Sequence, residues 1–438
     1  MTDFAARATE LDAADPLATS RDRFFGTSGT DAQLRGMPLA YFDGNSLGRP
    51  ARASIERIES VLRNEWGTRL IRSWDEGWMD FPYELGDKIG RVALGAAPGQ
   101  TFVGDSTSVI LYKLARAAVD AQLRDDPART EIVADSDNFP TDRYLLDGIA
   151  AERGMTLRWI AADPESGVTL EQVREVVSER TALVLLSHVA YRSGFMADGP
   201  GITAAAHDAG ALVLWDLSHS VGSVVVELDA WGADLASGCS YKYLCGGPGA
   251  PAFGYVASRH LERLEQPIQG WMGTADVFAM GPRYEAGPGI RRFLSGTPPV
   301  LGMLAMEPVL DMIGEVSIKA IRAKSVLLTE FVIEFADAHL APLGVTLASP
   351  RDSSRRGGHV TLNHPRMKQV TAELWEQDVI PDYRDPGGLR IGLSPLTTSF
   401  AEVITGMTRV ASSLTTPRVE YTGNDLLYRS RRDAGNHS

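Results

Sequence analysis

The chain has 438 residues with 43 Lys or Arg and 56 Asp or Glu, which gives a formal net charge of −13. An acidic surface repels phosphate backbones and anionic lipid, so neither a nucleic acid nor a membrane is an expected partner. Hydrophobic residues make up 44% of the chain, which is too apolar for a disordered protein. No apolar run reaches the roughly 20 residues that span a bilayer.

The cysteines and the N-terminus bear on the compartment. Cys239 and Cys245 are the two cysteines of the chain, too few for a disulfide framework, and they favour a reducing cytoplasm. Residues 1–17 are acidic and lack a basic stretch followed by an apolar one, so we expect no secretory signal.

Apolar runs alternate with helical patterns through the middle of the chain. The runs that we predict to be strands cover residues 131–134, 156–160, 182–187, 211–216 and 252–256. Apolar residues at helical spacing predict helices over 109–119 and 55–62, the latter ending at Gly67. Several runs are apolar on both faces, as buried parallel strands are. The alternation predicts an α/β fold, with a mainly parallel sheet covered by helices on both sides.

The pattern changes at about Pro299. Two long helices are predicted over 301–315 and 317–339, followed by strands at 345–347 and 359–362, a helix at 367–376, a strand at 388–392 and a helix at 400–414. Residues 351–358 form a polar, basic loop. We predict a segment 1–50 that joins the smaller domain, a large domain 51–300, a small α+β domain 301–415 and a weakly ordered tail 416–438.

Asp216 ends an apolar run, and therefore lies where open α/β sheets bind their ligands. A carboxylate there needs a cation or a strong donor, unless it simply caps the following helix. His219 follows closely enough to face the same space. The two side chains could hold a metal, but no third ligand occurs at a recognisable spacing, and we expect no metal.

Lys242 lies in the segment Ser240-Tyr-Lys-Tyr-Leu-Cys-Gly-Gly-Pro-Gly249. Most lysines are solvated surface charges. An amine between aromatic and small residues, away from acids, can instead have its pKa lowered enough to form an imine. Together with a strand-terminal aspartate that keeps a pyridine nitrogen protonated, such a lysine suggests pyridoxal phosphate.

Two further segments fit this cofactor. Gly104-Asp-Ser-Thr-Ser108 precedes a predicted helix, where hydroxyls and free N–H groups bind phosphate, although plain capping is the alternative. Asn138-Phe-Pro-Thr-Asp142 follows a strand, and Phe139 there is able to stack on a planar ring. No Gly-Lys-Ser/Thr phosphate loop or well-placed G-x-G-x-x-G supports a nucleotide instead.

These residues resemble the kynureninase family of fold-type-I pyridoxal phosphate enzymes, in its bacterial form. The resemblance rests on motifs in consistent order along most of the chain. They are Tyr41-Phe-Asp-Gly-Asn-Ser-Leu-Gly48, Ile71-Arg-Ser-Trp74, Asp137-Asn-Phe-Pro-Thr-Asp142, Trp215-Asp-Leu-Ser-His-Ser220, Ser240-Tyr-Lys-Tyr-Leu244, Gly270-Trp-Met-Gly273, Gly289-Ile-Arg-Arg-Phe-Leu-Ser-Gly-Thr-Pro-Pro299 and Gly388-Leu-Arg-Ile-Gly392.

The resemblance implies a large domain with a seven-stranded type of sheet, a small C-terminal domain and a homodimer. It also implies hydrolysis of L-kynurenine, or a ring-substituted kynurenine, to an anthranilate and L-alanine, in tryptophan catabolism or a secondary-metabolite branch. By resemblance Lys242 forms a Schiff base with the cofactor, Asp216 pairs with its ring nitrogen, and Tyr241 is a candidate proton donor. The other implied cofactor contacts are Thr107, Ser108, Phe139, Asp142, Ser187 and His219, with Trp271 and Thr297 supplied by the neighbouring subunit.

The substrate residues implied by the resemblance are Asn45, Ser46, Trp74 and Arg390. Arg390 corresponds to the arginine that grips the α-carboxylate, and a bidentate guanidinium suits that role. Three positions depart from the family pattern: Thr274 replaces a histidine, Thr397 a tyrosine and Cys245 an asparagine. We hypothesise that these changes accommodate a modified aryl ring.

Two alternatives remain open from the sequence. Another fold-type-I enzyme, an aminotransferase or a lyase acting on an aromatic amino acid, uses the same Asp, Lys and Arg. A cysteine desulfurase needs a mobile cysteine, whereas both cysteines here flank the lysine segment. A non-catalytic regulator of this fold would not need Lys242 or Arg390, and both are present.

Overall fold

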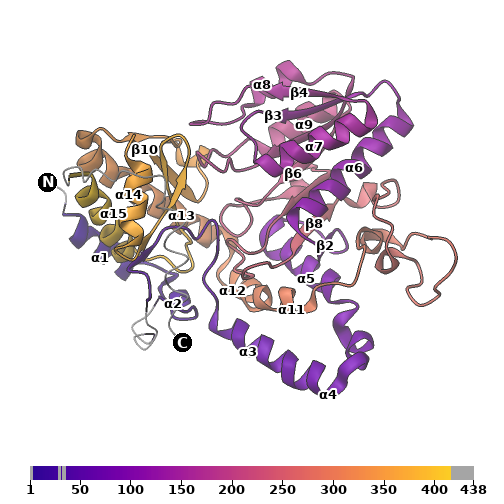
Figure 1. Ribbon diagram of the computed structural model, residues 1–438, viewed down its shortest axis with the longest axis horizontal. Coiled ribbons are helices and arrows are strands. Elements are labelled where there is room, and N and C mark those ends of the chain that lie inside the picture. The colour runs from indigo at the N-terminus through magenta and orange to yellow at the C-terminus, as the bar shows by residue number, and fades with distance from the viewer. Residues whose placement is uncertain (1–2, 28–30, 32–35, 416–438) are drawn as a thin grey trace, which may run out of the picture.

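The computed structural model describes residues 3–27, 31 and 36–415, and the chain forms two lobes (Figure 1). The tail predicted over 416–438 lies outside the described residues. Within the described ranges, no helix is both long enough and apolar enough to cross a membrane.

A seven-stranded sheet lies at the centre of the larger lobe. In spatial order its strands are β2 (Thr101–Gly104), β8 (Ala252–Val256), β7 (Leu235–Gly238), β6 (Leu212–Asp216), β5 (Thr181–Ser187), β3 (Glu131–Asp135) and β4 (Thr156–Ile160). Strand β8 is antiparallel to both of its neighbours, and the other adjacent pairs are parallel. The predicted mainly parallel sheet is confirmed. Strands β2 and β7 escaped prediction because they are short and contain glycine and small polar residues.

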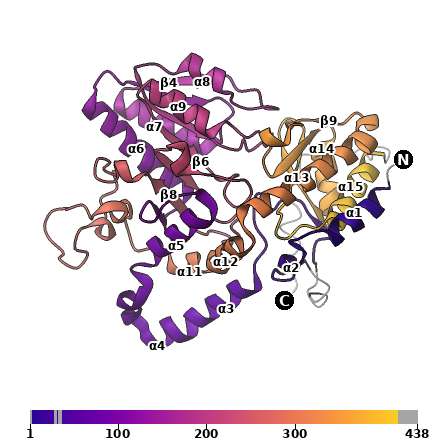
Figure 2. The ribbon, with the colours of Figure 1, turned by 180° about the vertical axis from the view of Figure 1, so that it is seen from behind.

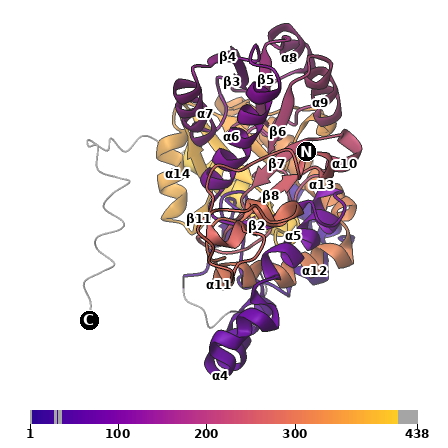
Figure 3. The same ribbon diagram turned by 90° about the vertical axis from the view of Figure 1, so that its right-hand side faces the viewer.

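Helices cover both faces of this sheet (Figure 3). Successive strand side chains point to opposite faces, so alternate residues enter different cores. Ile132 and Leu183 pack with α6 (Thr107–Asp125) and α7 (Pro140–Arg153), whereas Val133, Val184 and Trp215 share a core with residues from other helices. These helices include α5 (Phe81–Ile89), α8 (Leu170–Val176) and α9 (Gly199–Asp208). The strand ends between the two layers are therefore left to form the site.

Helix α3 (Arg52–Ser60) begins an arm that projects from the larger lobe (Figure 2). It continues through a π-helical turn (Val61–Trp66) into α4 (Gly67–Arg69). The predicted end at Gly67 is wrong: Gly67 has helical φ and ψ of −65° and −29°, and the chain first leaves helical geometry at Leu70, where φ is 55°. Glycine permits a helix end but does not force one.

The smaller lobe contains a four-stranded antiparallel sheet, packed against helices. Its strands are β12 (Asp382–Arg384), β13 (Gly388–Gly392), β10 (His359–Asn363) and β9 (Thr346–Leu347). Its helices are α13 (Ile318–Phe335), α14 (Met367–Trp375) and α15 (Phe400–Thr415). The smaller lobe is thus α+β, but it begins later than the predicted boundary at 301, because the apolar residues of segment 300–316 pack in the core of the larger lobe. The loop predicted at 351–358 is polar, yet Arg356 within it is buried and donates to the carbonyls of Pro350 and Arg351.

Segments from both ends of the chain meet in the smaller lobe. Strand β1 (Ala40–Tyr41) pairs in parallel with β11 (Val379–Ile380), and α1 (Phe4–Ala13) sets the Phe4 ring 5.7 Å from that of Phe331. Helices α11 (Val300–Met303) and α12 (Glu307–Val316), in contrast, bury their apolar residues in the core of the larger lobe. Helix α13 therefore runs from one core to the other.

Candidate active site

A cavity of about 140 Å³ lies at the carboxyl ends of β5 and β6, beside the first turns of α6 and α7. It brings together nine residues predicted from the sequence: Thr107, Ser108, Phe139, Asp142, Ser187, Asp216, His219, Tyr241 and Lys242. Sequence reasoning missed four further lining residues: Leu111, Thr141, Tyr191 and Ser218. Tyr191 and Ser218 follow strands β5 and β6 by a few positions, and this is the signal by which they could have been found.

Asp216 is the last residue of β6 and is 6% exposed. Its Oδ1 accepts from the Ser218 amide at 2.9 Å, and its Oδ2 lies 3.4 Å from the Ser187 hydroxyl. The alternative that Asp216 caps a helix is not observed, because the chain turns after it rather than entering a helix. Each oxygen accepts one hydrogen bond from the protein, and a carboxylate oxygen has a second lone pair for a donor in the cavity.

Asp142 supplies a second buried carboxyl group. Neither of its oxygens has a hydrogen-bond partner among the described residues. Burial, followed by the negative charges of Asp216 and Asp135, raises the pKa of Asp142 well above its ordinary value. The charge of Lys242 offsets this only in part, so two buried carboxyl groups are costly here, whereas a protonated ring nitrogen with polar ring substituents would satisfy both. The residues therefore fit pyridoxal phosphate.

Lys242 directs its amine at a histidine. Its Nζ lies 3.0 Å from Nε2 of His219 and 6.0 Å from the centre of the Tyr241 ring. Burial and the positive charge of Lys242 lower the pKa of His219 well below its ordinary value, so the ring is neutral at pH 7 and Nε2 accepts from the amine. Burial and the neighbouring Cys239 raise the pKa of Tyr241, so its phenol keeps the proton.

The start of α6, which lines the cavity, suits a phosphate. Thr107 and Ser108 lie in the first turn of α6, and Ser106 at its N-cap makes no side-chain capping bond. Hydroxyls and amides at the start of a long helix bind phosphate well. Phe139 is 39% exposed and meets Tyr191 edge to face at 5.5 Å, which leaves a ring face for stacking.

Arg390, on β13, contacts two of the predicted substrate residues, Asn45 and Ser46. Its side chain is 1% exposed, its Nη2 donates to the Ser46 hydroxyl at 2.8 Å and its Nη1 to the Tyr191 carbonyl at 2.8 Å. With its amide turned to satisfy both ends, Asn45 accepts from Nε at 3.1 Å. Because Tyr191 lines the cavity, Arg390 stands next to the Lys242 site.

Three predicted residues lie away from this cavity. Trp74 lines a separate apolar cavity of about 350 Å³, together with Trp66, Trp78 and residues 298–302. Trp271 is 40% exposed and Thr297 is exposed. Within one chain these three do not meet Lys242, and their roles stay predictions.

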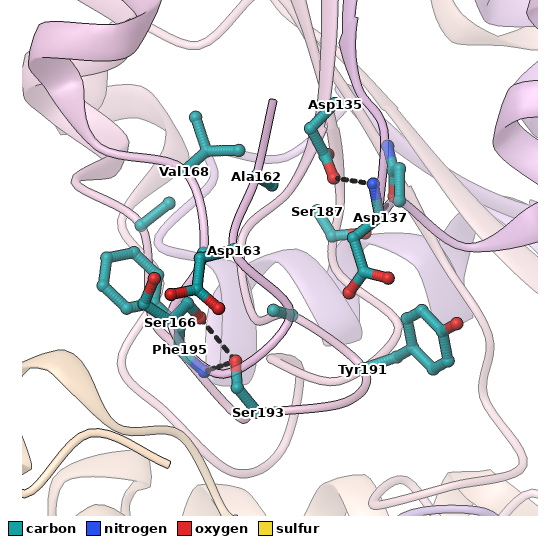
Figure 4. A pocket seen from close by; sticks show the side chains of 14 residues that line it. Asp135, Asp137, Ala162, Asp163, Ser166, Val168, Ser187, Tyr191, Ser193 and Phe195 are labelled. Carbon is teal, nitrogen blue, oxygen red and sulfur yellow. Dashed lines mark hydrogen bonds between the residues drawn. The ribbon is translucent and has the colours of Figure 1, made fainter. Parts of the chain in front are cut away.

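A smaller acidic cavity adjoins the first and shares Ser187 and Tyr191 with it. Figure 4 shows the carboxylates of Asp137 and Asp163 directed into it. Burial raises the pKa of Asp135 there to about 7. In the described part of the chain, no three His, Cys, Asp or Glu side chains are placed to hold a metal.

Solved structures share this fold at low sequence identity. A cysteine desulfurase from Thermococcus onnurineus superposes with a TM-score of 0.73 at 19% identity, covering 86% of this chain and 94% of that one. Cysteine desulfurase CsdA from Escherichia coli gives 0.74 at 15% identity, covering 91% and 98%. These likenesses show the fold, and in this chain the strand-terminal Asp216 and Lys242 line one cavity, which is the residue pair that a fold-type-I enzyme uses to hold pyridoxal phosphate.

Sequence relatives specify the class further. Kynureninase from Pseudomonas fluorescens is 40% identical over 396 residues, 90% of this chain and 91% of that protein. Kynureninase from Burkholderia pseudomallei is 41% identical over 399 residues, with coverages of 90% and 92%. Residues 321–410 match the kynureninase C-terminal domain model. The chain belongs to the kynureninase family.

The three departures from the family pattern lie around the site rather than in its cavity. The Thr274 hydroxyl donates to the Trp271 carbonyl at 2.7 Å, and Thr397 is buried in the smaller lobe. Cys245 is buried with a φ of 52°, a left-handed geometry that asparagine adopts more readily. Gly48 approaches it so closely that a Cβ would lie 2.5 Å from its Sγ, which requires glycine there.

Proposed function

We propose that this protein hydrolyses L-kynurenine, or a ring-substituted kynurenine, to an anthranilate and L-alanine. The observation that carries the proposal is the position of Arg390 at the edge of the cavity that holds Lys242, Asp216 and Asp142. A buried guanidinium beside an amine is what an α-amino acid requires. Membership of the kynureninase family supports the aryl ketone as the rest of the substrate.

When bound, pyridoxal phosphate withdraws electrons from the substrate's Cα. Asp216 and Asp142 would hold the ring nitrogen and the polar ring edge, Phe139 would stack on the ring, and Thr107 and Ser108 would hold the phosphate. Lys242 would carry the cofactor and, when the substrate's amine replaces its own, take the Cα proton. Neutral His219, 3.0 Å away, accepts a hydrogen bond from this amine and keeps it directed at the reacting carbon.

Arg390, held by Ser46 and Asn45, would bind the α-carboxylate and so orient the substrate. Water then adds to the γ-carbonyl, the Cβ–Cγ bond breaks, and Cβ receives a proton to give alanine. Tyr241 keeps its phenolic proton at neutral pH because burial raises its pKa, which suits a donor. The aryl carbon leaves as the carboxylate of anthranilate, and the two products together contain one added water.

We also propose that the enzyme is a cytoplasmic homodimer. The exposed positions of Trp271 and Thr297 support their use in the site of a second copy. Both cysteines are free, buried thiols, as in proteins of a reducing compartment. We place the reaction in tryptophan catabolism or in a secondary-metabolite branch.

Purified protein with pyridoxal phosphate, mixed with L-kynurenine, is expected to release fluorescent anthranilate and L-alanine in equal amounts. Formation of a keto acid without anthranilate would refute the proposal and favour aminotransfer. The ring preference is tested by kcat/KM for kynurenine and its 3-hydroxy, halo and methyl analogues. A strong preference for plain kynurenine would reject a role for Thr274, Thr397 and Cys245 in accepting a modified ring.

A further inference from the structure

Arg390, which we assign to the substrate carboxylate, already forms an ion pair with a carboxylate of the protein. Asp382, on β12, places its Oδ2 2.7 Å from Nη2 of Arg390. This pair was not expected from the sequence. The register explains it, because Asp382 stands opposite Arg390 on the adjacent antiparallel strand.

A ligand carboxylate can bind only those N–H groups of Arg390 that protein groups leave free. A guanidinium has five of them. The N–H of Nε points to Asn45, and one N–H of Nη1 donates to the Tyr191 carbonyl. The two N–H groups of Nη2 bind Ser46 and Asp382. These contacts occupy four of the five. A carboxylate bound through two parallel hydrogen bonds needs two N–H groups, so an incoming substrate needs one that a protein group now holds.

Of the groups that bind Arg390, Asp382 is best able to give up the guanidinium N–H that it holds. The same Oδ2 accepts from Nε of Arg384 at 2.6 Å, so Asp382 keeps an ion-pair partner after it leaves Arg390. Its side chain is 20% exposed and that of Arg384 is 36% exposed, so water reaches both. Within the described residues, the Tyr191 carbonyl and the Ser46 hydroxyl have no such second cation.

Arg390 does not need Asp382 for its position. Tyr191, Ser46 and Asn45 each hold a different nitrogen or hydrogen of the guanidinium, and together they come from two distant segments of the chain. Asp382 therefore contributes charge more than orientation. A substrate carboxylate arriving beside it would also be repelled by it, since like charges a few ångströms apart disfavour each other.

We propose that Asp382 is an internal competitor for the substrate's α-carboxylate, which takes its place on Nη2 of Arg390 while Asp382 stays with Arg384. The proposal rests on the kynureninase activity proposed above and adds a residue that sets substrate affinity. Asp382 is a positioning residue that acts through Arg390. It holds the charge of the buried arginine balanced until an amino acid arrives.

The test is Asp382→Asn in the full-length holoenzyme. Removal of the competing charge is expected to lower KM for L-kynurenine roughly five- to tenfold, with the change on KM rather than kcat. The affinity for the decarboxylated analogue of kynurenine, which keeps the amine and the aryl ketone, should not change. Asp382→Glu, which keeps the charge, should keep KM near that of the wild type, and Asp382→Ser repeats the charge loss if the Asn variant does not fold.

Arg384→Gln gives a second, coupled readout. It leaves Asp382 with Arg390 as its sole arginine partner and should raise KM in the wild type, and this rise should shrink when Asp382 is already Asn. The matched control is Asp385→Asn, which removes an exposed carboxylate near Arg384 that accepts from Tyr383 instead of Arg390. Its KM should stay within about twofold of the wild type.

A KM that rises or stays constant in Asp382→Asn would overturn the proposal, because Asp382 would then orient Arg390 or be indifferent. Equal effects of Arg384→Gln in both backgrounds would overturn it as well. If the wild-type holoenzyme releases no anthranilate, the proposed activity fails on its own. Calorimetric affinity for L-alanine, expected to rise in Asp382→Asn, still tests the competition in that case.

Discussion

Lys113 forms a buried connection between the loop that precedes the predicted phosphate site and the segment 293–295. Its side chain is 0% exposed, and its Nζ donates to Asp105 at 2.8 Å, to the Phe293 carbonyl at 2.7 Å and to the Ser295 hydroxyl at 3.2 Å. Asp105 belongs to the loop before α6, and Ser295 precedes Thr297. Replacement of Lys113 by Met keeps the approximate length of the side chain and removes all three bonds.

The cost follows from what each partner loses. The Asp105 side chain is 30% exposed and is able to rehydrate, which reduces its share. The Phe293 carbonyl loses a charged donor in a buried position, at a cost of about 1–3 kcal/mol. With the weakened Asp105 loop included, we expect Lys113→Met to destabilise the larger lobe by about 3 kcal/mol, which lowers Tm by roughly 6–12 °C.

The assay combines thermal unfolding with the Kd for pyridoxal phosphate, which should rise about tenfold because the loop before Thr107 loses its anchor. The control is Lys88→Met, which breaks a pair with Asp311, a residue whose side chain is 54% exposed. Such a surface pair contributes about 0–1 kcal/mol. Equal Tm values for the two variants, or an unchanged Kd in Lys113→Met, would refute this account.

Three further predictions concern the site and a buried network. In Lys242→Ala, borohydride treatment of the holoprotein should leave the mass of the chain unchanged, whereas the wild type should gain a pyridoxyl group; a mass gain in the variant would place the linkage elsewhere. Burial raises the pKa of Asp43, which lies 3.7 Å from Arg390, to about 6. A second anion on Arg390 should bind less well once Asp43 ionises, so KM should rise as pH increases through about 6, and Asp43→Asn should abolish that rise. Burial alone would raise the pKa of Asp234, but hydrogen bonds from His207 and His260 outweigh it and hold the pKa below its ordinary value. Asp234 therefore stabilises the fold above its unfolded pKa of about 3.9, and this contribution declines as pH falls from that value through the lower folded pKa. Urea unfolding at pH 7 should show Asp234→Asn as less stable than the wild type, with a gap that narrows toward pH 3; a gap of constant size would contradict the assignment.

The parallel core was predictable because its strands are continuous apolar runs. Residues 182–187 and 211–216 lack polar residues except at their ends, and a strand covered on both faces requires this pattern. Strand β7 (Leu235–Gly238) gives no such signal, since its partners rather than its own propensity hold it extended. The continuation of α3 beyond Gly67 was missed because a glycine inside a helix has the same sequence signature as a glycine at its end.

The cofactor side of the site was predictable for a topological reason. Parallel strands end at one edge of the sheet, so polar residues after β3, β5 and β6 come together whatever the details of packing. Phe139, Ser187 and Asp216 each follow or end one of these strands. The residues at or just after the ends of these strands therefore include most of the predicted residues on the cofactor side of the cavity.

The substrate side follows a different rule. Arg390 and Ser46 are separated by 344 positions, and the Tyr191 carbonyl comes from the other lobe. No local pattern announces that Asp382, and not Asp378 or Asp385, stands opposite Arg390, because this depends on the register of two short strands. The order of the strands thus determines which residues form the cofactor site, whereas the affinity for substrate depends on packing between distant segments. Substitutions that shift β12 by one residue should therefore change KM while the cofactor remains bound.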